Sequence, residues 1–385
     1  MKKIVSLSLA LLLVVEVLTG CEKITLQTDA TAKCDTFAKG ADISILKRLE
    51  DVGAVYSENG KTKDALQIFK DHGFNWMRLR LFHTPNWKGP VCNDIPYTLE
   101  LAKRIKAHRF ALLLDFHYSD TWADPGKQYI PAAWKGLSHE QLEQKVFEYT
   151  RNTIATFREE GCLPDMVQLG NEITNGTLWP DSCLGGEFDT PQQWARLAGI
   201  VKAGIRGVKA GAGPNNCVKI MVHIDRGGDR TASEHFFDNL LARGVDFDVI
   251  GLSYYPFWHG SFDDLRENLK FLTPKYKKPI IVVETGCPWA PQRFYDGDVL
   301  LSVEESTRRF LPYPPTPQGQ KAFLTELMQI VRNTPNNRGK GVFYWAPEWI
   351  PAKAWGKPNY SLTWEHRALF DLNGKMLPAM KAFEE

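Results

Sequence analysis

The sequence predicts an α/β fold: a single-domain (β/α)8 (TIM) barrel with long loops on its C-terminal rim. Short apolar runs alternate with longer helical segments, and eight such pairs follow one another from about residue 37. Strands separated by helices form parallel sheets, and a length of 385 residues allows such a sheet to close. An open, doubly wound sheet is the alternative, although no segment resembles its Gly-rich phosphate-binding turn.

The eight predicted strands are short apolar runs bounded by turn or polar residues, as expected of buried parallel strands. They cover residues 40–45, 76–82, 110–117, 166–172, 218–225, 248–255, 280–284 and 341–345. The predicted helices cover residues 63–72, 97–108, 140–160, 191–210, 232–243, 262–276, 317–332 and 378–385. Pro191 suits a first helical turn, and Gly244 suits the end of a helix.

The longest segments between these elements all follow strands. They are residues 84–96, 119–139, 173–190, 285–317 and 346–377. In a barrel, segments that follow strands gather on one rim, where active sites are built.

The composition argues against nucleic acid as a ligand. The net charge is +2, and Lys and Arg are interspersed with Asp and Glu rather than grouped. A neutral small molecule or polymer is the better expectation. The 12 Trp residues are many for this length, and Trp faces also serve as stacking platforms for sugars.

The first 20 residues are predicted to be a lipoprotein signal peptide. Lys2 and Lys3 precede an apolar run over residues 4–17, and small residues come just before Cys21. Cys21 is then the lipidated residue that tethers the chain to a membrane, with an ordinary signal peptide as the alternative. Residues 21–36 would be a polar tether and residues 37–385 the barrel.

Six further cysteines are present in a chain predicted to be exported. Export permits disulfides, but the sequence cannot choose among the pairings, and unpaired thiols are the alternative. The cysteines are Cys34, Cys92, Cys162, Cys183, Cys217 and Cys287.

Two glutamates end predicted strands, Glu172 on the fourth and Glu284 on the seventh. Buried Glu is rare unless it is paired. Retaining glycoside hydrolysis needs two carboxyls about 5 Å apart, one as acid and one as nucleophile. A rim salt bridge explains either glutamate alone, but the two together favour catalysis.

The residues around this pair suggest how each carboxyl is tuned. Arg78 and Arg80 both point inward by strand parity, and Arg80, nearer the rim, is predicted to hold Glu284 anionic. Tyr254 is predicted to donate a hydrogen bond to the same carboxylate. Asn171, beside the predicted acid, can both donate a hydrogen bond to a sugar hydroxyl and accept one from it.

Several motifs together resemble glycoside hydrolase family 53, the endo-β-1,4-galactanases, within the larger clan of retaining glycosidases on (β/α)8 barrels. The most distinctive is L-D-F-H-Y-S-D-T-W-A-D-P-G-K-Q, at residues 114–128. The others are at residues 40–44, 77–82, 168–172, 250–258 and 283–286.

The resemblance implies hydrolysis of β-1,4-galactan, a side chain of pectin and of type I arabinogalactan. It implies Glu172 as acid/base and Glu284 as nucleophile, with Asn171 on the sugar hydroxyl at carbon 2. Trp345 would be the platform for the sugar that is attacked. Further contacts along the cleft are expected from His117, Asp120, Trp122, Trp289 and Trp349.

No cofactor is expected for the catalytic steps. Bacterial members of the family would carry a longer acidic loop after the seventh strand that can hold calcium. Here Asp296 and Asp298 are the only candidates, and a hard cation wants six to eight oxygens. Glu348 is also displaced from the position expected after Trp345.

The expected partner is galactan, and the chain is expected to be a monomer. A mannanase or xylanase of the same clan is one alternative. A non-catalytic glycan-binding lipoprotein is the other, although the intact glutamate pair argues against it.

Overall fold

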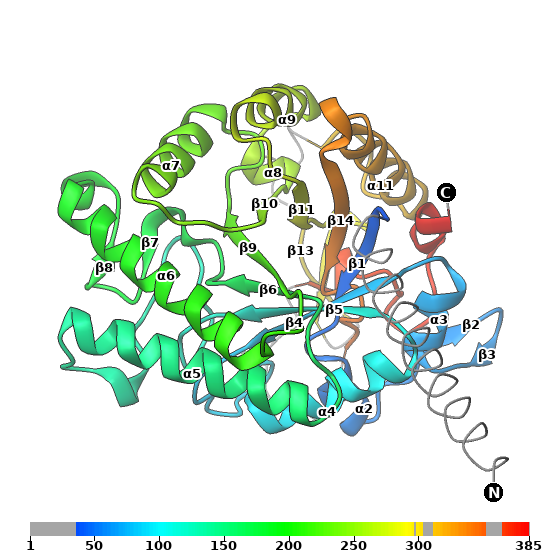
Figure 1. Ribbon diagram of the computed structural model, residues 1–385. Helices are drawn as coiled ribbons and strands as arrows, with labels where there is room; N and C mark the ends of the chain where they lie inside the picture. Colours follow the sequence, from blue (N-terminus) through cyan, green and yellow to red (C-terminus); the bar gives the residue numbers. More distant parts are fainter. Residues whose placement is uncertain (1–35, 296–297, 303–310, 352–363, 385) are drawn as a thin grey trace, which may run out of the picture. The chain divides into compact units, whose positions relative to one another are not determined.

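Eight parallel strands close into a barrel, which confirms the predicted fold (Figure 1). The ring closes where the first strand pairs with both the second and the last. In chain order the strands are β1 (Ala38–Asp42), β4 (Trp76–Leu81), β5 (Ala111–Phe116), β6 (Met166–Leu169), β9 (Lys219–Ile224), β10 (Val249–Ser253), β11 (Ile280–Glu284) and β14 (Gly339–Trp345). The structure, a computed structural model, describes residues 36–295, 298–302, 311–351 and 364–384.

Helices lie outside the strands and surround them (Figure 1). The longer ones are α3 (Ala65–Asp71), α4 (Ile95–Ala107), α5 (His139–Glu159), α6 (Pro191–Ala212), α7 (Arg230–Ala242), α9 (Phe262–Tyr276) and α11 (Pro317–Arg332). Side-chain caps begin most of them: Ser138 forms a capping box at α5, and Thr190 caps α6 just before Pro191.

Some element boundaries differ from the prediction. The first strand ends at Asp42 and is followed by the short helix α2 (Leu46–Asp51), because the amide of Leu46 bonds back to the carbonyl of Ile43. The last predicted helix is a 3-10 helix, Pro378–Glu384. Small hairpins and the short helix α8 (Pro256–His259) were not predicted, since they are too short to show a period.

Side chains two residues apart on a strand point the same way, so every second residue of each strand faces the barrel interior. The lower part of this interior is apolar: Ala38, Trp76, Ala111, Leu113, Met166, Met221, Val249, Ile281, Val283 and Phe343. Toward the carboxyl ends of the strands the inward positions turn polar. We call this buried set the polar layer: Asp42, Arg78, Asp115, Gln168, His223 and Ser253.

Two further findings concern the predicted export. The helices in the described ranges include none that is long and apolar enough to cross a membrane. The five cysteines within those ranges are all free thiols, so none of the disulfides that export would permit is formed among them. Residues 1–20, the tether up to residue 35 and Cys34 lie outside the described ranges.

Candidate active site

A cavity of about 580 Å³ opens above the polar layer, at the carboxyl ends of the strands. Both Glu172 and Glu284 line it, together with Asp42, Arg78 and Asn171. The barrel thus brings the two predicted catalytic carboxyls into one cleft, on the rim where (β/α)8 enzymes carry their active sites.

Glu172 stands just past the end of β6 in a left-handed conformation, with φ at 48°. Its Oε1 accepts a hydrogen bond of 2.6 Å from the hydroxyl of Ser253. Burial raises the pKa of Glu172 well above its ordinary value, and the negative charges of Glu284 and Asp225 raise it further. Such a carboxyl keeps its proton near neutral pH, as a general acid must.

Glu284 ends β11 and receives the donors that a nucleophile needs. Arg78 lies 2.8 Å from its Oε1, and the hydroxyl of Tyr255 donates to its Oε2 at 3.2 Å. Burial raises the pKa of Glu284 to about 7, while Arg78 acts in the opposite direction. Because no such cation contacts Glu172 among the described residues, the proton of the pair belongs on Glu172.

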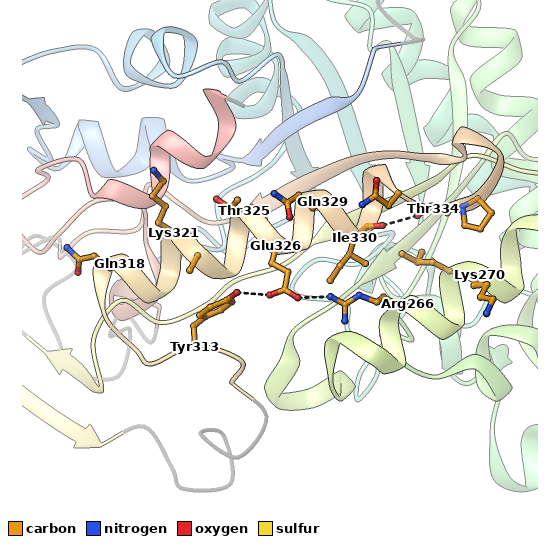
Figure 2. Close-up of a pocket in the computed structure, with 14 residues that line it drawn as sticks. Arg266, Lys270, Tyr313, Gln318, Lys321, Thr325, Glu326, Gln329, Ile330 and Thr334 are labelled. Atoms are coloured by element: carbon orange, nitrogen blue, oxygen red, sulfur yellow. Dashed lines mark hydrogen bonds and ion pairs between the residues drawn. The ribbon is translucent and has the colours of Figure 1, made fainter.

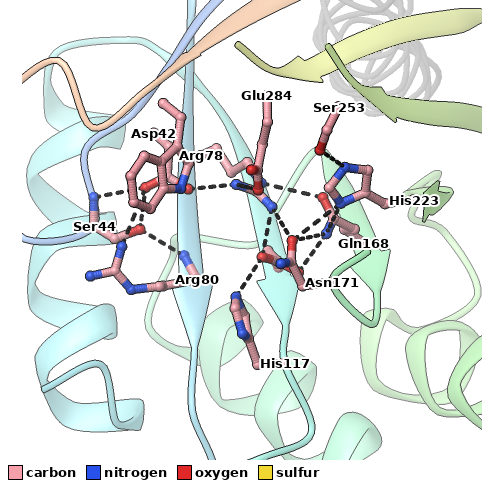
Figure 3. Close-up of polar contacts among 12 residues, drawn as sticks. Asp42, Ser44, Arg78, Arg80, His117, Gln168, Asn171, His223, Ser253 and Glu284 are labelled. Carbon is pink, nitrogen blue, oxygen red and sulfur yellow. Dashed lines mark hydrogen bonds and ion pairs between the residues drawn. The ribbon is translucent and has the colours of Figure 1, made fainter. Parts of the chain in front are cut away.

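Arg78 is the central cation of the polar layer (Figure 3). Besides Glu284, its guanidinium contacts Asp42 at 2.7 Å, Asp115 at 2.8 Å and the side-chain oxygen of Asn171 at 2.9 Å. Arginine presents donors in a rigid fork, so one side chain can hold several acceptors in place.

The prediction that Arg80 holds Glu284 is wrong. Arg80 donates to the carbonyl of Pro90 and lies 4.2 Å from the ring centre of Trp122. Arg78 lies two residues before Arg80 on β4 and therefore deeper in the barrel, so its long side chain reaches the carboxylate of Glu284 from below. Arg80 is nearer the strand end and turns toward the following loop, where it still lines the cleft.

The prediction that Tyr254 contacts Glu284 is also wrong. The hydroxyl of Tyr254 donates to the carbonyl of Gly260, and its ring is fully buried outside the cleft. Ser253 points inward, so its neighbour Tyr254 points outward and Tyr255 inward again. Tyr255 therefore takes the place predicted for Tyr254.

Asn171 and His117 line the cleft as predicted, and both are held by other side chains or backbone. Asn171 accepts from Arg78 and donates to the carbonyl of Ala123 at 2.9 Å. Nδ1 of His117 accepts from the amide of Ala123, and its Nε2 lies 3.1 Å from Asp115. Their orientation is therefore fixed before any ligand binds.

Aromatic rings form much of the cleft wall. Trp122 and Trp349 each lie 6.0 Å from Trp345, ring centre to ring centre. Trp364 meets Trp345 edge-on at 4.6 Å. Trp258 also lines the cleft and is 64% exposed, which leaves its face open to a ligand.

Asp120 and Trp289 do not line the cleft. The carboxylate of Asp120 accepts from the amides of Thr84 and Ala132, so it ties two loops together. The indole of Trp289 donates to the carbonyl of Glu365 at 2.8 Å. Both were predicted as sugar contacts and instead bind neighbouring backbone.

A larger cavity, of about 770 Å³, lies outside the barrel between α9 and α11 (Figure 2). At its centre Glu326 pairs with Arg266 at 2.6 Å and accepts from the hydroxyl of Tyr313. Of the described residues only one carboxylate lines this groove, and it is paired with Arg266, so the paired carboxyls of the rim cleft have no counterpart among them.

The predicted calcium ligands cannot be placed. Asp296 lies outside the described residues, and the side chain of Asp298, in strand β13 (Asp298–Ser302), does too. Elsewhere in the described ranges, no group of three or more His, Cys, Asp or Glu side chains could hold a metal ion.

Comparison with known proteins gives this arrangement a family. Residues 38–383 match the sequence profile of glycosyl hydrolase family 53. The chain belongs to glycosyl hydrolase family 53. This confirms the resemblance inferred from the motifs.

Several relatives of this family 53 chain are similar over nearly their whole length. An endo-β-1,4-galactanase of Bacillus subtilis is 34% identical, over 90% of this chain and 85% of its own. An arabinogalactan endo-β-1,4-galactanase of Cellvibrio japonicus is also 34% identical, over 90% of each. An uncharacterized protein of Niallia circulans is 44% identical, over 91% of this chain and 94% of its own.

Solved structures agree with this assignment. The family 53 catalytic domain of Ignisphaera aggregans is 37% identical with a TM-score of 0.83, covering 90% of this chain and 95% of its own. A structure of fungal β-1,4-galactanases is 31% identical with a TM-score of 0.76, covering 90% and 98%.

Sequence reasoning missed several residues of the family 53 site. Strand parity could have found the polar layer, because each of its residues lies two or four residues after an inward-facing apolar residue on the same strand. No local signal marks the aromatic residues on the later loops. The missed residues are Asp115, Gln168, His223, Ser253, Tyr255, Trp258 and Trp364.

Proposed function

We propose that this family 53 chain is a retaining endo-β-1,4-galactanase that hydrolyses galactan and type I arabinogalactan. The observation that carries the proposal is that two glutamates in one cleft have different surroundings. Glu284 is held by Arg78 and Tyr255, whereas Glu172 is buried with no cation in contact within the described part of the chain. The named relatives from Bacillus subtilis and Cellvibrio japonicus support galactan as the substrate and endo cleavage as its mode.

In the first step Glu172 gives its proton to the oxygen of the bond that breaks, while Glu284 attacks the anomeric carbon. This forms a glycosyl-enzyme ester and releases the rest of the chain. In the second step the ionised Glu172 takes a proton from water, whose oxygen attacks the same carbon and frees Glu284. Two inversions give net retention.

The surrounding side chains position the sugar. Asn171 is held beside the acid by Arg78 and Ala123, within the cleft, where a hydroxyl next to the reacting carbon would lie. Trp345 offers a ring at the cleft wall as a platform for the attacked galactose.

The test is digestion of unbranched β-1,4-galactan, with xylan and mannan as separate substrates. Reducing ends should appear from galactan, and proton NMR of the first products should show the β anomer. Glu172→Gln and Glu284→Gln should each lose at least about a hundredfold in kcat. Glu187→Gln, at an exposed site, is the control and should keep full activity. Near-normal activity of either cleft variant would refute the roles assigned.

We also propose that Cys21 carries a lipid anchor, since it follows a basic and apolar leader. Cells expressing the chain should incorporate labelled palmitate into it and retain it in the membrane fraction. Cys21→Ser should abolish the label. Equal labelling of the variant would exclude this anchor.

A further inference from the structure

A chain of hydrogen bonds runs through the polar layer to Glu172 from two other strands, and Figure 3 shows its first part, between His223 and Ser253. Nε2 of His223, on β9, lies 2.8 Å from the hydroxyl of Ser253, on β10. That hydroxyl in turn lies 2.6 Å from Oε1 of Glu172. His223 and Ser253 are completely buried, so no solvent competes for these bonds.

The direction of each hydrogen in this chain follows from the donors around His223. Nδ1 of His223 lies 3.0 Å from the amide nitrogen of Gln168 and 3.2 Å from the side-chain oxygen of Asn171, so these two contacts alone do not place its hydrogen. The backbone amide of Glu172 decides, because it can only donate and it points at Nδ1 at 3.3 Å. Nδ1 is therefore an acceptor, and a neutral imidazole must carry its hydrogen on Nε2. Ser253 accepts that hydrogen, so its own hydrogen points to Glu172.

This direction makes the two oxygens of Glu172 unequal. Oε1 is already an acceptor for Ser253, so a proton on Oε1 would leave the buried serine hydrogen without an acceptor. Oε2 has no hydrogen-bond partner among the described residues, and Glu172 lines the cleft.

We propose that Ser253 and His223 are positioning residues that fix the catalytic proton of Glu172 on Oε2, the oxygen that serves the leaving group. This rests on the proposed role of Glu172 as acid/base. The same oxygen gives up the proton in the first step and takes one from water in the second. Ser253 donates to Oε1 in both states, so the carboxyl need not rotate between the steps.

No charged group around Glu172 and Glu284 takes over the positioning of the proton on Glu172, so Ser253 and His223 are left to do it. The groups acting on Glu172 from neighbouring elements are Glu284, Asp225 and Asp124, all acidic, and these raise its pKa. The hydrogen bond from Ser253 is the influence that lowers it. Tyr255 faces both carboxyls, and Arg78 contacts Asn171 and Glu284 rather than Glu172.

His223 is suited to remain neutral throughout. Burial lowers its pKa well below the ordinary value, and the nearby charge of Arg78 lowers it further. A neutral His223 keeps its hydrogen on Nε2 over the pH range in which Glu172 exchanges its proton. The orientation of Ser253 therefore does not change with pH in that range.

The test compares Ser253→Ala with Ser233→Ala. Ser233 is also fully buried, accepts from Asn268 at 3.1 Å and donates to the carbonyl of Arg226 at 2.9 Å, but it lies on α7 outside the barrel. Each variant thus loses a buried serine with one accepted and one donated bond, and only Ser253 touches Glu172.

Two readouts are needed, the pH profile of kcat/KM on galactan and the titration of Glu172 by carbon-13 NMR of labelled carboxyls. Ser253→Ala loses a bond that favours the ionised carboxylate, so the pKa of Glu172 should rise by about one unit. The alkaline limb of the profile should then move to higher pH, and kcat should fall about tenfold. Ser233→Ala should shift neither.

Ser253→Cys keeps a side chain of nearly the same size with a weaker donor. It should therefore raise the pKa of Glu172 and move the alkaline limb in the same direction as Ser253→Ala, but by less. It serves as the test if the alanine variant does not fold. The inference is overturned if both Ser253 variants leave the titration and the alkaline limb where they are in the wild type. If the wild type releases nothing from galactan, the proposed function fails, while the NMR titration still shows whether Ser253 sets the protonation of Glu172.

Discussion

At the scale of single residues, the roles in this cleft follow from which atoms each side chain touches. Tyr254 and Tyr255 are neighbours in sequence, yet Tyr254 supports a loop outside the barrel and Tyr255 contacts Glu284, the proposed nucleophile. Residue type alone could not separate them, whereas their opposite parity on the strand could have done so. Because their contacts differ, the same substitution at Tyr254 and at Tyr255 gives a matched pair of variants.

Tyr255→Phe should lower kcat about tenfold, because it removes one hydrogen bond to Glu284 of about 1.4 kcal/mol. The bond favours the ionised carboxylate, so its loss should also raise the pKa of Glu284 and move the acid limb of the profile to higher pH. Tyr254→Phe should leave kcat and the limb unchanged and cost about 1 kcal/mol of stability. Kinetics from pH 4 to 9 check both variants, and the reverse pattern would contradict the structure.

Glu348 is a second residue whose environment has a measurable consequence. It is completely buried, its Oε1 accepts from the amide of Ile45 at 3.1 Å, and its Oε2 has no partner within the described ranges. Burial raises its pKa to about 8, and the negative charge of Asp42 adds to that rise. The folded chain therefore holds this proton more tightly than the unfolded chain.

Between the unfolded pKa, about 4.3, and the folded pKa, about 8, the folded state binds more protons than the unfolded state. The stability that Glu348 contributes is thus fully present at low pH and is lost as pH rises through this window, by up to about 1.4 kcal/mol per pH unit. Glu348→Gln should remove this slope. Urea unfolding at pH 5, 6, 7 and 8 measures the free energy of unfolding of the wild type and of Glu348→Gln. If this free energy changes with pH in the same way in both proteins, the role assigned to Glu348 is contradicted.

At the scale of elements, strand order and the rim position of the glutamates could be predicted, because they depend on periodicity within each strand. Strand ends could not. The predicted strand 248–255 continues past the last residue of β10, Ser253, because its end is set by pairing with β11. That pairing shifts register between Leu252 and Ser253, and an inserted residue of this kind leaves no mark in a single sequence.

Helix packing is another feature that the sequence patterns do not reveal. Helices α5 and α6 approach closely where α6 carries glycines. A Cβ added at Gly207 would lie 2.7 Å from Cβ of Thr150 and 2.9 Å from the carbonyl oxygen of Phe147. Intrinsic helix propensity favours alanine there, whereas packing opposes it.

Gly207→Ala should destabilise the protein by about 1–2 kcal/mol, because the backbone of α5 must move and this outweighs a propensity gain of about 1 kcal/mol. Arg206→Ala, at the exposed neighbouring position, should change stability by less than about 0.5 kcal/mol. Urea unfolding measures both, and kcat should stay unchanged because these helices lie outside the barrel. A stabilised Gly207→Ala variant would mean that the helices can separate without cost.

At the scale of the whole molecule, the described part of the chain is held by its barrel core and without disulfides, although export would permit them. Cys92, Cys162 and Cys287 are buried, and burial raises the pKa of the first two thiols to about 11 and of the third to about 12. Thiols in this state are poor nucleophiles, because the thiolate is the reactive form. Only Cys217 is exposed among the described cysteines.

A chain carrying Cys21→Ser and Cys34→Ser should therefore react quickly with a thiol reagent at Cys217 and more slowly at the half-buried Cys183. The three buried thiols should react only after unfolding, and a reducing agent should leave Tm unchanged. Mass spectrometry of the labelled peptides assigns each site, and Cys217→Ser should remove the fast phase alone. A lower Tm under reducing conditions would instead reveal a disulfide, and the barrel would then depend on a covalent link as well as on its core.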